Sequence, residues 1–210
     1  MRTISYIRSK VFLVILLSLI VSGCATTEPS RFYTLHASED LGTIQQSSAY
    51  KYTVAIGPVE IPDYLDRPQI VSRTNQNEIT FSEFQRWAGS LEEDISRVLS
   101  ENLTLLLSGD SVSVSLWEWG ATSDYRIAVH IRRFDIMPEG DVLLSARCTL
   151  IDSDGRTQLL TWEARVTETI TAQTYDAKVS SMSRALEKLS EDIAGKIRDF
   201  SQNNDAKKNT

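Results

Sequence analysis

Few residues in this 210-residue chain have the type and spacing that chemistry requires. Glu60 with Asp63 or Asp66 could form the carboxylate pair of a glycosidase, but such a pair needs a cleft, and nothing in the sequence indicates one. Asp152 and Asp154 could bind calcium, although aspartate is common in turns for local backbone reasons. We therefore expect ordinary structural roles for these carboxylates, in preference to either site.

Histidine and cysteine are too sparse for a metal centre or a nucleophilic site. His36 and His130 lie far apart, and no His/Cys/Asp cluster has the spacing of metal ligands. We expect His130 to be a surface residue and Cys148, on the apolar side of an expected strand, to be a small core residue. No nucleophile elbow, phosphate loop or Ser/His/Asp arrangement is visible. The sequence therefore predicts a protein that is not an enzyme and has no cofactor and no metal.

The chemistry that the sequence does support is acylation of Cys24. A basic start precedes an apolar run over residues 11–21, and Ser22 and Gly23 lie directly before Cys24. The run is shorter than the roughly 20 residues that a bilayer span requires. We therefore expect residues 1–23 to be a signal peptide and Cys24 to become a lipidated N-terminus, whose acyl chains hold the protein on a membrane. The alternative is an uncleaved anchor helix with an incidental cysteine.

Charge and length limit the partners and the size of the fold. The net charge is −6, and loss of the signal peptide, which holds three basic residues and no acidic ones, leaves 187 residues at about −9. Such a balance argues against nucleic acid and against broad adhesion to anionic lipid. The length suffices for one good-sized core, and with Cys24 acylated Cys148 has no partner for an intrachain disulfide.

Hydrophobic periodicity predicts two halves, each a run of strands closed by a helix. The first half has expected strands at 31–35, 52–61, 69–74 and 78–82 and a helix at about 88–107, with Ser90 as N-cap and Glu93 as its capping-box partner. The second half has expected strands at 111–117, 124–137, 141–151 and 158–170 and a helix at 176–200. A phase slip at Arg132-Arg133 indicates a β-bulge.

These elements predict an α+β fold, with largely antiparallel sheets and two main helices packed on them in one domain over residues 31–200. Residues 24–30 form a lipidated tether, in which the polar residues 25–30 reach roughly 20 Å when extended at ~3.3 Å per residue. The polar residues 201–210 are expected to be a disordered tail.

The most distinctive stretch, here called the proline block, is residues 57–71, GPVEIPDYLDRPQIV. Three prolines within eleven residues are expected to exclude a central strand or a helix interior and to form a rigid, extended connection. A presented binding loop could use the four residues at its centre, Tyr64, Leu65, Asp66 and Arg67. A purely structural crossover is an equally weighted alternative.

Tryptophans at a strand end give a second candidate contact. Trp117 and Trp119 lie on alternate sides of one strand register, so at least one of residues 117–119 should be exposed at the strand end. Trp119 is our candidate partner contact.

The order of these pieces resembles the ABC-type transport auxiliary lipoproteins, the PqiC/YmbA-like family, over nearly all of the mature chain. The matching motifs are the small residues before Cys24, Phe32-Tyr33-Thr34-Leu35, the proline block, Arg86-Trp87-Ala88, and Leu189-Ser190 with Ile193-Ala194. Gly89-Ser90 departs from the Glu-Pro pair expected after the Trp-Ala.

The resemblance implies an outer-membrane lipoprotein that faces the periplasm and docks a tunnel made by an MCE-domain protein (PqiB-like), which carries lipid between the two membranes and supports envelope integrity. Ala25 after the cysteine is similar to the residue in lipoproteins that are exported to the outer membrane. Exposed strand edges also predict homo-oligomerisation. The alternatives are an assembly or pilot lipoprotein of another envelope machine and, with less support, a cell-wall hydrolase that uses carboxylates.

Overall fold

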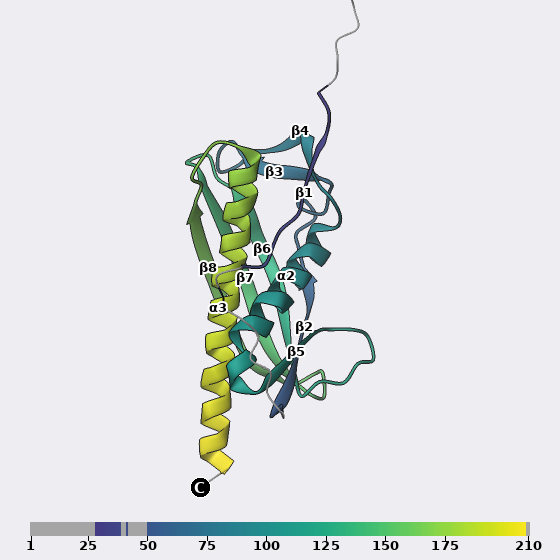
Figure 1. Ribbon diagram of the computed structural model, residues 1–210, viewed down its shortest axis with the longest axis vertical. Coiled ribbons are helices and arrows are strands. Elements are labelled where there is room, and N and C mark those ends of the chain that lie inside the picture. The colour runs from purple at the N-terminus through teal and green to yellow at the C-terminus, as the bar shows by residue number, and fades with distance from the viewer. Residues whose placement is uncertain (1–27, 39–40, 42–49, 209–210) are drawn as a thin grey trace, which may run out of the picture.

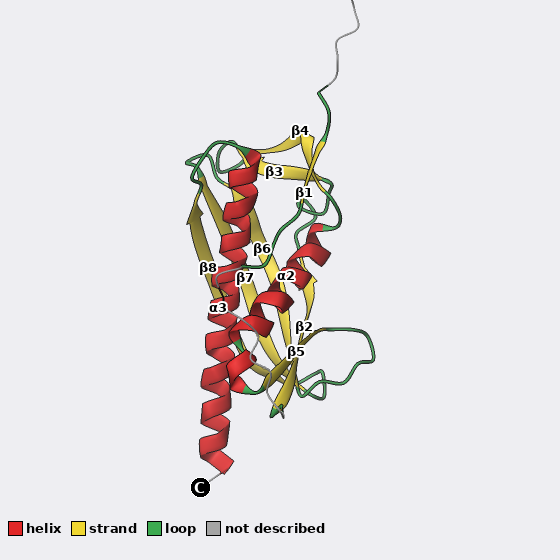
Figure 2. Ribbon diagram, viewed as in Figure 1, coloured by secondary structure: helices red, strands yellow, loops and turns green. Residues whose placement is uncertain are grey.

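The computed structural model describes residues 28–38, 41 and 50–208, and Figures 1 and 2 show one curved sheet with two long helices. In chain order the elements are β1 (Arg31–Tyr33), β2 (Tyr52–Glu60), β3 (Gln69–Arg73), β4 (Ile79–Trp87), α2 (Leu91–Leu106), η2 (Ser108–Asp110), β5 (Val112–Leu116), β6 (Tyr125–Ile136), β7 (Asp141–Asp152), β8 (Gln158–Thr169) and α3 (Tyr175–Lys208). The α+β class predicted from the sequence is confirmed.

Strand β6 joins the two expected halves into a single eight-stranded sheet. Along one edge β6 pairs with β7 over its whole length. Along its other edge it pairs first with β2 and then with β3. The β3–β4, β6–β7 and β7–β8 pairs are antiparallel, whereas β1–β4, β2–β5, β2–β6 and β3–β6 are parallel. The sheet is therefore mixed, because strands from different runs meet through crossovers, which favour parallel pairing.

Both helices cover the same face of the sheet (Figure 2), and among the described residues the other face carries no helix. Helix α2 packs on β2 and β5, α3 packs on β7 and β8, and the two helices contact each other. The core lies between these layers, where Ile95 and Leu99 of α2 and Leu189 of α3 are fully buried. An amphipathic stripe of this kind is what the 3.6-residue period predicts.

Local sequence signals account for the ends of several elements. The Ser90 hydroxyl accepts a hydrogen bond from the Glu93 amide at 3.3 Å, so α2 begins as the capping motif predicts. The β6–β7 register shifts between Ile131 and Arg133, which confirms the predicted bulge. This shift turns Phe134 and Ile136 into the core.

Two features differ from the sequence predictions. Helix α3 continues to Lys208, so residues 201–208 are helical rather than a disordered tail; Ser201 bonds the hydroxyl of Tyr52, and Phe200 packs edge-on against Tyr125. Pro58 lies inside β2, an interior strand, which the three prolines were expected to exclude. Proline is tolerated at this position because the β2–β6 register shifts between Ile56 and Val59. The backbone nitrogen of Pro58 is therefore not required to donate a hydrogen bond to the neighbouring strand.

Candidate functional site

The centre of the proline block forms the loop of residues 61–68 between β2 and β3, and backbone hydrogen bonds hold it in place. The Leu65 amide donates to the Pro62 carbonyl and the Arg67 amide to the Leu65 carbonyl, both at 2.8 Å. The Trp87 amide of β4 donates to the Pro68 carbonyl at 2.7 Å. The loop is therefore an ordered part of the body.

Leu65 is only 2 % exposed and belongs to the core cluster. We expected it to contact a partner, and that expectation is wrong for its side chain. Burying a leucine contributes about 2 kcal/mol, so the side chain fastens the loop to the body instead of standing free in water.

A second group that holds the 61–68 loop on the body is the buried carboxylate of Asp135 on β6, which was not among the residues expected from the sequence. This carboxylate is fully buried and accepts hydrogen bonds from three side chains: the Tyr64 hydroxyl (2.7 Å), Arg73 Nε (2.5 Å) and Arg133 Nε (2.9 Å). The two guanidinium groups compensate the buried charge, and the phenol ties the loop to them. We call this group the Asp135 clamp.

Titration of the clamp follows from its contacts. Burial and the hydrogen bond to Asp135 raise the pKa of Tyr64 to about 12, because the neighbouring carboxylate opposes a second negative charge. The same carboxylate raises the pKa of Arg73 through their hydrogen bond. One sequence signal could have revealed the clamp: an aspartate that alternates with Phe134 and Ile136 inside a predicted strand.

What remains of the proline block on the surface is small and charged. Asp66 is exposed, and the Arg67 guanidinium lies 3.9 Å from the centroid of the Phe81 ring on β4. The Nε atom of Arg67 is buried and has no hydrogen-bond partner among the described residues. Of the four predicted loop contacts, Asp66 and the rest of the Arg67 side chain are therefore best placed to meet a partner.

Trp119 lies in the loop between β5 and β6, residues 117–124, which projects from the body beside β5 (Figure 1). It is 91 % exposed, which confirms that this strand end presents a tryptophan to solvent. Its ring packs edge-on against Trp117 at 6.0 Å between centroids, and Arg126 lies over the Trp117 ring. The structure thus keeps Trp119 and the 61–68 loop as two separate candidate surfaces.

The other sequence candidates have structural partners. His130 is exposed, as predicted, and its Nδ1 lies 3.0 Å from a carboxylate oxygen of Glu60. Asp154 accepts hydrogen bonds from Arg156 and Thr157 in its own turn, which lowers its pKa to about 2. Within the described residues, no three His, Cys, Asp or Glu side chains group as metal ligands do. Cys148 is buried as predicted, and burial raises its pKa to about 12.

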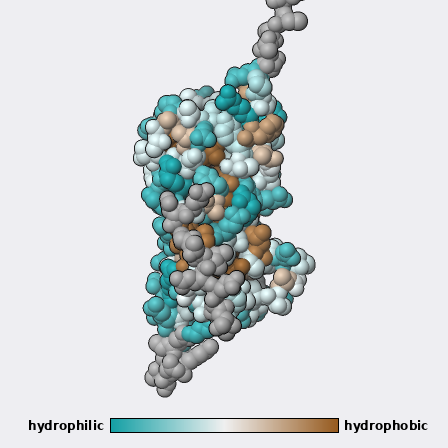
Figure 3. Space-filling view, viewed as in Figure 1, coloured by the Kyte–Doolittle hydropathy of each residue, from teal (hydrophilic) through white to brown (hydrophobic). Residues whose placement is uncertain are grey.

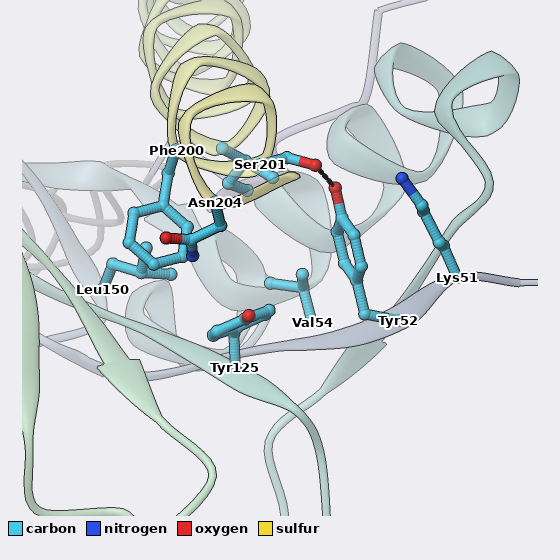
Figure 4. Close-up of a pocket in the computed structure, with 9 residues that line it drawn as sticks. Lys51, Tyr52, Val54, Tyr125, Leu150, Phe200, Ser201 and Asn204 are labelled. Atoms are coloured by element: carbon cyan, nitrogen blue, oxygen red, sulfur yellow. Dashed lines mark hydrogen bonds between the residues drawn. The ribbon is translucent and has the colours of Figure 1, made fainter. Parts of the chain in front are cut away.

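A small cavity of about 110 Å³ lies beneath the last turns of α3 (Figure 4). Its aromatic wall consists of Tyr52, Tyr125 and Phe200, and Figure 4 shows the Tyr52 hydroxyl directed at Ser201. Drug-sized ligands occupy pockets of about 300–1,000 Å³, and no carboxylate pair or nucleophile lines this one. The residues that line this cavity therefore serve to pack α3 against the sheet.

The anchor lies outside the described residues, which begin at residue 28, so the expected signal peptide and lipidation of Cys24 have no structural counterpart. Among the helices of the described chain, none combines the length and the apolar character that crossing a bilayer requires.

Comparison with known proteins identifies the class. The model of the ABC-type transport auxiliary lipoprotein component matches residues 33–194, and the chain belongs to this family. The match spans strands β2 to β8 and most of α3, and it agrees with the resemblance noted from the sequence motifs.

Two crystal structures share the fold. XCC0632 from Xanthomonas campestris, of family DUF330, has a TM-score of 0.66 at 16 % identity, covering 84 % of this chain and 99 % of its own. An uncharacterized protein has a TM-score of 0.66 at 20 % identity, covering 81 % and 99 %. No curated protein matches the sequence at a significant level.

Proposed function

We propose that this protein is the outer-membrane lipoprotein of an MCE-type system for lipid transport between membranes, anchored through Cys24 and facing the periplasm. The observation that carries the proposal is membership of the transport auxiliary family over residues 33–194. The lipoprotein box before Cys24 supports the anchor, and Ala25 after it supports sorting to the outer membrane. In this role the domain docks the end of a periplasmic tunnel formed by a PqiB-like MCE protein.

We further propose that two surfaces make the docking contact: Asp66 with Arg67 on the proline block, and Trp119 on its projecting loop. Tryptophan and arginine are the residue types that most often dominate binding energy at protein interfaces. Both surfaces lie on loops that connect strands of the sheet, so binding would lose little conformational entropy in the body of the protein. Tyr64 and Leu65 act indirectly, by holding Asp66 and Arg67 in place.

Co-purification with the MCE partner tests this proposal. We expect W119A and the double variant D66A/R67A each to reduce partner recovery at least about tenfold, since a hot-spot residue contributes 2 kcal/mol or more. E191A, an exposed change on the outer side of α3, is the matched control. Undiminished recovery by both variants, with folding intact, would contradict the proposed contacts while leaving the family assignment unchanged.

Homo-oligomerisation also belongs to this proposal. Strands β5 and β8 end the sheet at opposite edges, and each leaves one row of backbone groups without a neighbouring strand in the described chain. Such edges can pair with another copy. Native mass spectrometry of the full lipoprotein in detergent would show a single defined multiple of the chain mass, whereas a monomer at every concentration would contradict self-association.

A further inference from the structure

The end of the molecule where the N-terminal tether enters carries two exposed phenylalanines. The described chain begins with residues 28–30 at the end of the long axis where β1, β3 and β4 lie, while α3 ends at the opposite pole (Figure 1). Phe32 of β1 is 65 % exposed, and Phe81 of β4 is 40 % exposed. Figure 3 shows brown, apolar surface among the polar side chains at this end.

Local structure explains why these rings face outward. Tyr33 packs against Tyr175 of α3 with ring centroids 6.2 Å apart, so strand alternation turns Phe32 away from the body. Strand β1 pairs only with residues 85–87 of β4, which leaves the part of β4 that holds Phe81 at the sheet edge. Solvent exposure of large apolar rings at one end of a molecule is typical of an interaction surface.

We propose that Phe32 and Phe81 rest in the interfacial region of the membrane that holds the Cys24 anchor, and that this second contact sets the orientation of the domain. The inference rests on the proposed acylation. Only seven residues lie between Cys24 and Phe32, and the eight steps that join them span about 26 Å when fully extended at ~3.3 Å per residue. The tether therefore keeps Phe32 beside the bilayer at a high effective concentration, so that even a weak contact is populated.

Charge around the two rings suits this environment. The guanidinium group of Arg67 covers one face of Phe81, and Arg86 is the register partner of Phe32 across β1 and β4. Arginine heads beside aromatic rings match the boundary between lipid phosphates and acyl chains.

Exposed acidic residues, Asp66 and Glu83, lie in the same region, so its charge is mixed. Apolar contact rather than net attraction therefore drives the proposed interaction. We expect it to depend weakly on the content of anionic lipid, in contrast to a polybasic surface.

The contact would place the pole at which α3 ends away from the membrane. Helix α3 has 34 residues and a length of about 50 Å, and it runs from the tether end to the opposite pole (Figure 1). With Phe32 and Phe81 on the bilayer, the projecting Trp119 loop is held beyond the headgroups, whereas Asp66 and Arg67 lie close to the headgroup level. A periplasmic partner that meets both proposed docking surfaces must therefore approach the bilayer.

An environment-sensitive fluorophore on introduced cysteines tests the inference in the full, acylated protein. Phe32→Cys, Phe81→Cys and the control Leu116→Cys are labelled with a nitrobenzoxadiazole maleimide; Leu116 is 45 % exposed but lies on β5, away from the tether, and buried Cys148 is protected. The proteins are bound to vesicles of phosphatidylethanolamine and phosphatidylglycerol, with and without brominated acyl chains.

We expect a blue shift and at least about twofold quenching by brominated lipid at positions 32 and 81, and no quenching at 116. Vesicle flotation reports the anchor separately. Protein that floats without quenching at 32 and 81 overturns this inference alone, and a blue shift that brominated lipid does not quench overturns it in favour of a protein neighbour. Failure to float would overturn the anchor itself and this inference with it.

Discussion

The 61–68 loop of the proline block and the Trp119 loop both connect strands and carry large side chains, but they are built in opposite ways. Each places large side chains between two strands, and both were candidates for partner contact. In the 61–68 loop Leu65 is buried and Tyr64 bonds to the buried Asp135. In the other loop Trp119 is 91 % exposed, and its ring contact is with Trp117 of the same loop.

The two loops therefore differ in whether their large side chains hold the loop on the body or face the solvent. A loop fastened by buried groups can hold a few polar residues, here Asp66 and Arg67, in one fixed arrangement. The Trp119 loop presents its largest side chain itself. Changes at Tyr64 and Leu65 should therefore alter stability, and changes at Trp119 should alter binding alone.

The largest expected effect comes from removing the clamp with Asp135→Ala. The change leaves Arg73 and Arg133 without their shared buried carboxylate, and loss of one partner from a buried ion pair costs about 3 kcal/mol. Urea unfolding measures the loss. Arg147→Ala, which breaks an exposed pair with Glu163, is the control and should cost less than about 1 kcal/mol. Equal effects of the two changes would refute a stabilising clamp.

Leu65→Ala should come next, with a loss of about 2–3 kcal/mol from a cavity beneath the 61–68 loop. The matched control is Leu116→Ala, the same change at a side chain that is 45 % exposed, where the loss should stay near 0.5 kcal/mol. A Leu65 variant as stable as this control would mean that the loop is not fastened through its leucine.

Tyr64→Phe should cost about 1 kcal/mol at neutral pH, the net contribution of one hydrogen bond. The folded protein raises the pKa of Tyr64 from 10.0 to about 12, so the neutral phenol stabilises the fold fully below pH 10, and this contribution falls as pH rises from 10 towards 12. The stability difference between wild type and Tyr64→Phe should therefore shrink between pH 9 and pH 11.5. A constant difference across that range would exclude the phenol from the clamp.

Trp119→Ala should have the smallest effect on stability, within about 0.5 kcal/mol, because its exposed ring buries little surface on folding. The same change should weaken binding to the MCE partner. Thermal unfolding and partner recovery measured on one preparation separate these two effects. A large drop in melting temperature would show that Trp119 fastens its loop as Leu65 does.

Sequence periodicity was sufficient for the elements and the class of the fold. The Ser90 cap, the bulge at residues 131–133 and the buried stripe of α2 all follow from local pattern. Pairing between strands of different runs was not predictable, because a strand pattern fixes which face is buried but not which strand lies alongside. The single mixed sheet therefore required the structure.

Within the candidate site, the sequence could not predict how exposed to solvent each side chain would be. Leu65 and Trp119 are both large apolar residues in connections, yet one is buried and the other exposed. Asp135 lies 71 residues from Tyr64 and 62 from Arg73 in the sequence, so no local signal links this carboxylate to either partner. Long-range contacts of this kind decide whether a loop residue holds the fold or faces a partner.

Photo-crosslinking from Asp66 and Trp119 in the native membranes, with the captured proteins identified by mass, tests the central claim most directly. The full lipoprotein carries the crosslinker at one position at a time, and position 191 on α3 serves as the control. We predict an MCE-domain protein as the main adduct at 66 and 119 and its absence at 191. Capture of secretion or wall-synthesis proteins at 66 and 119, without an MCE protein, would contradict the proposed role and favour an assembly factor for another envelope machine.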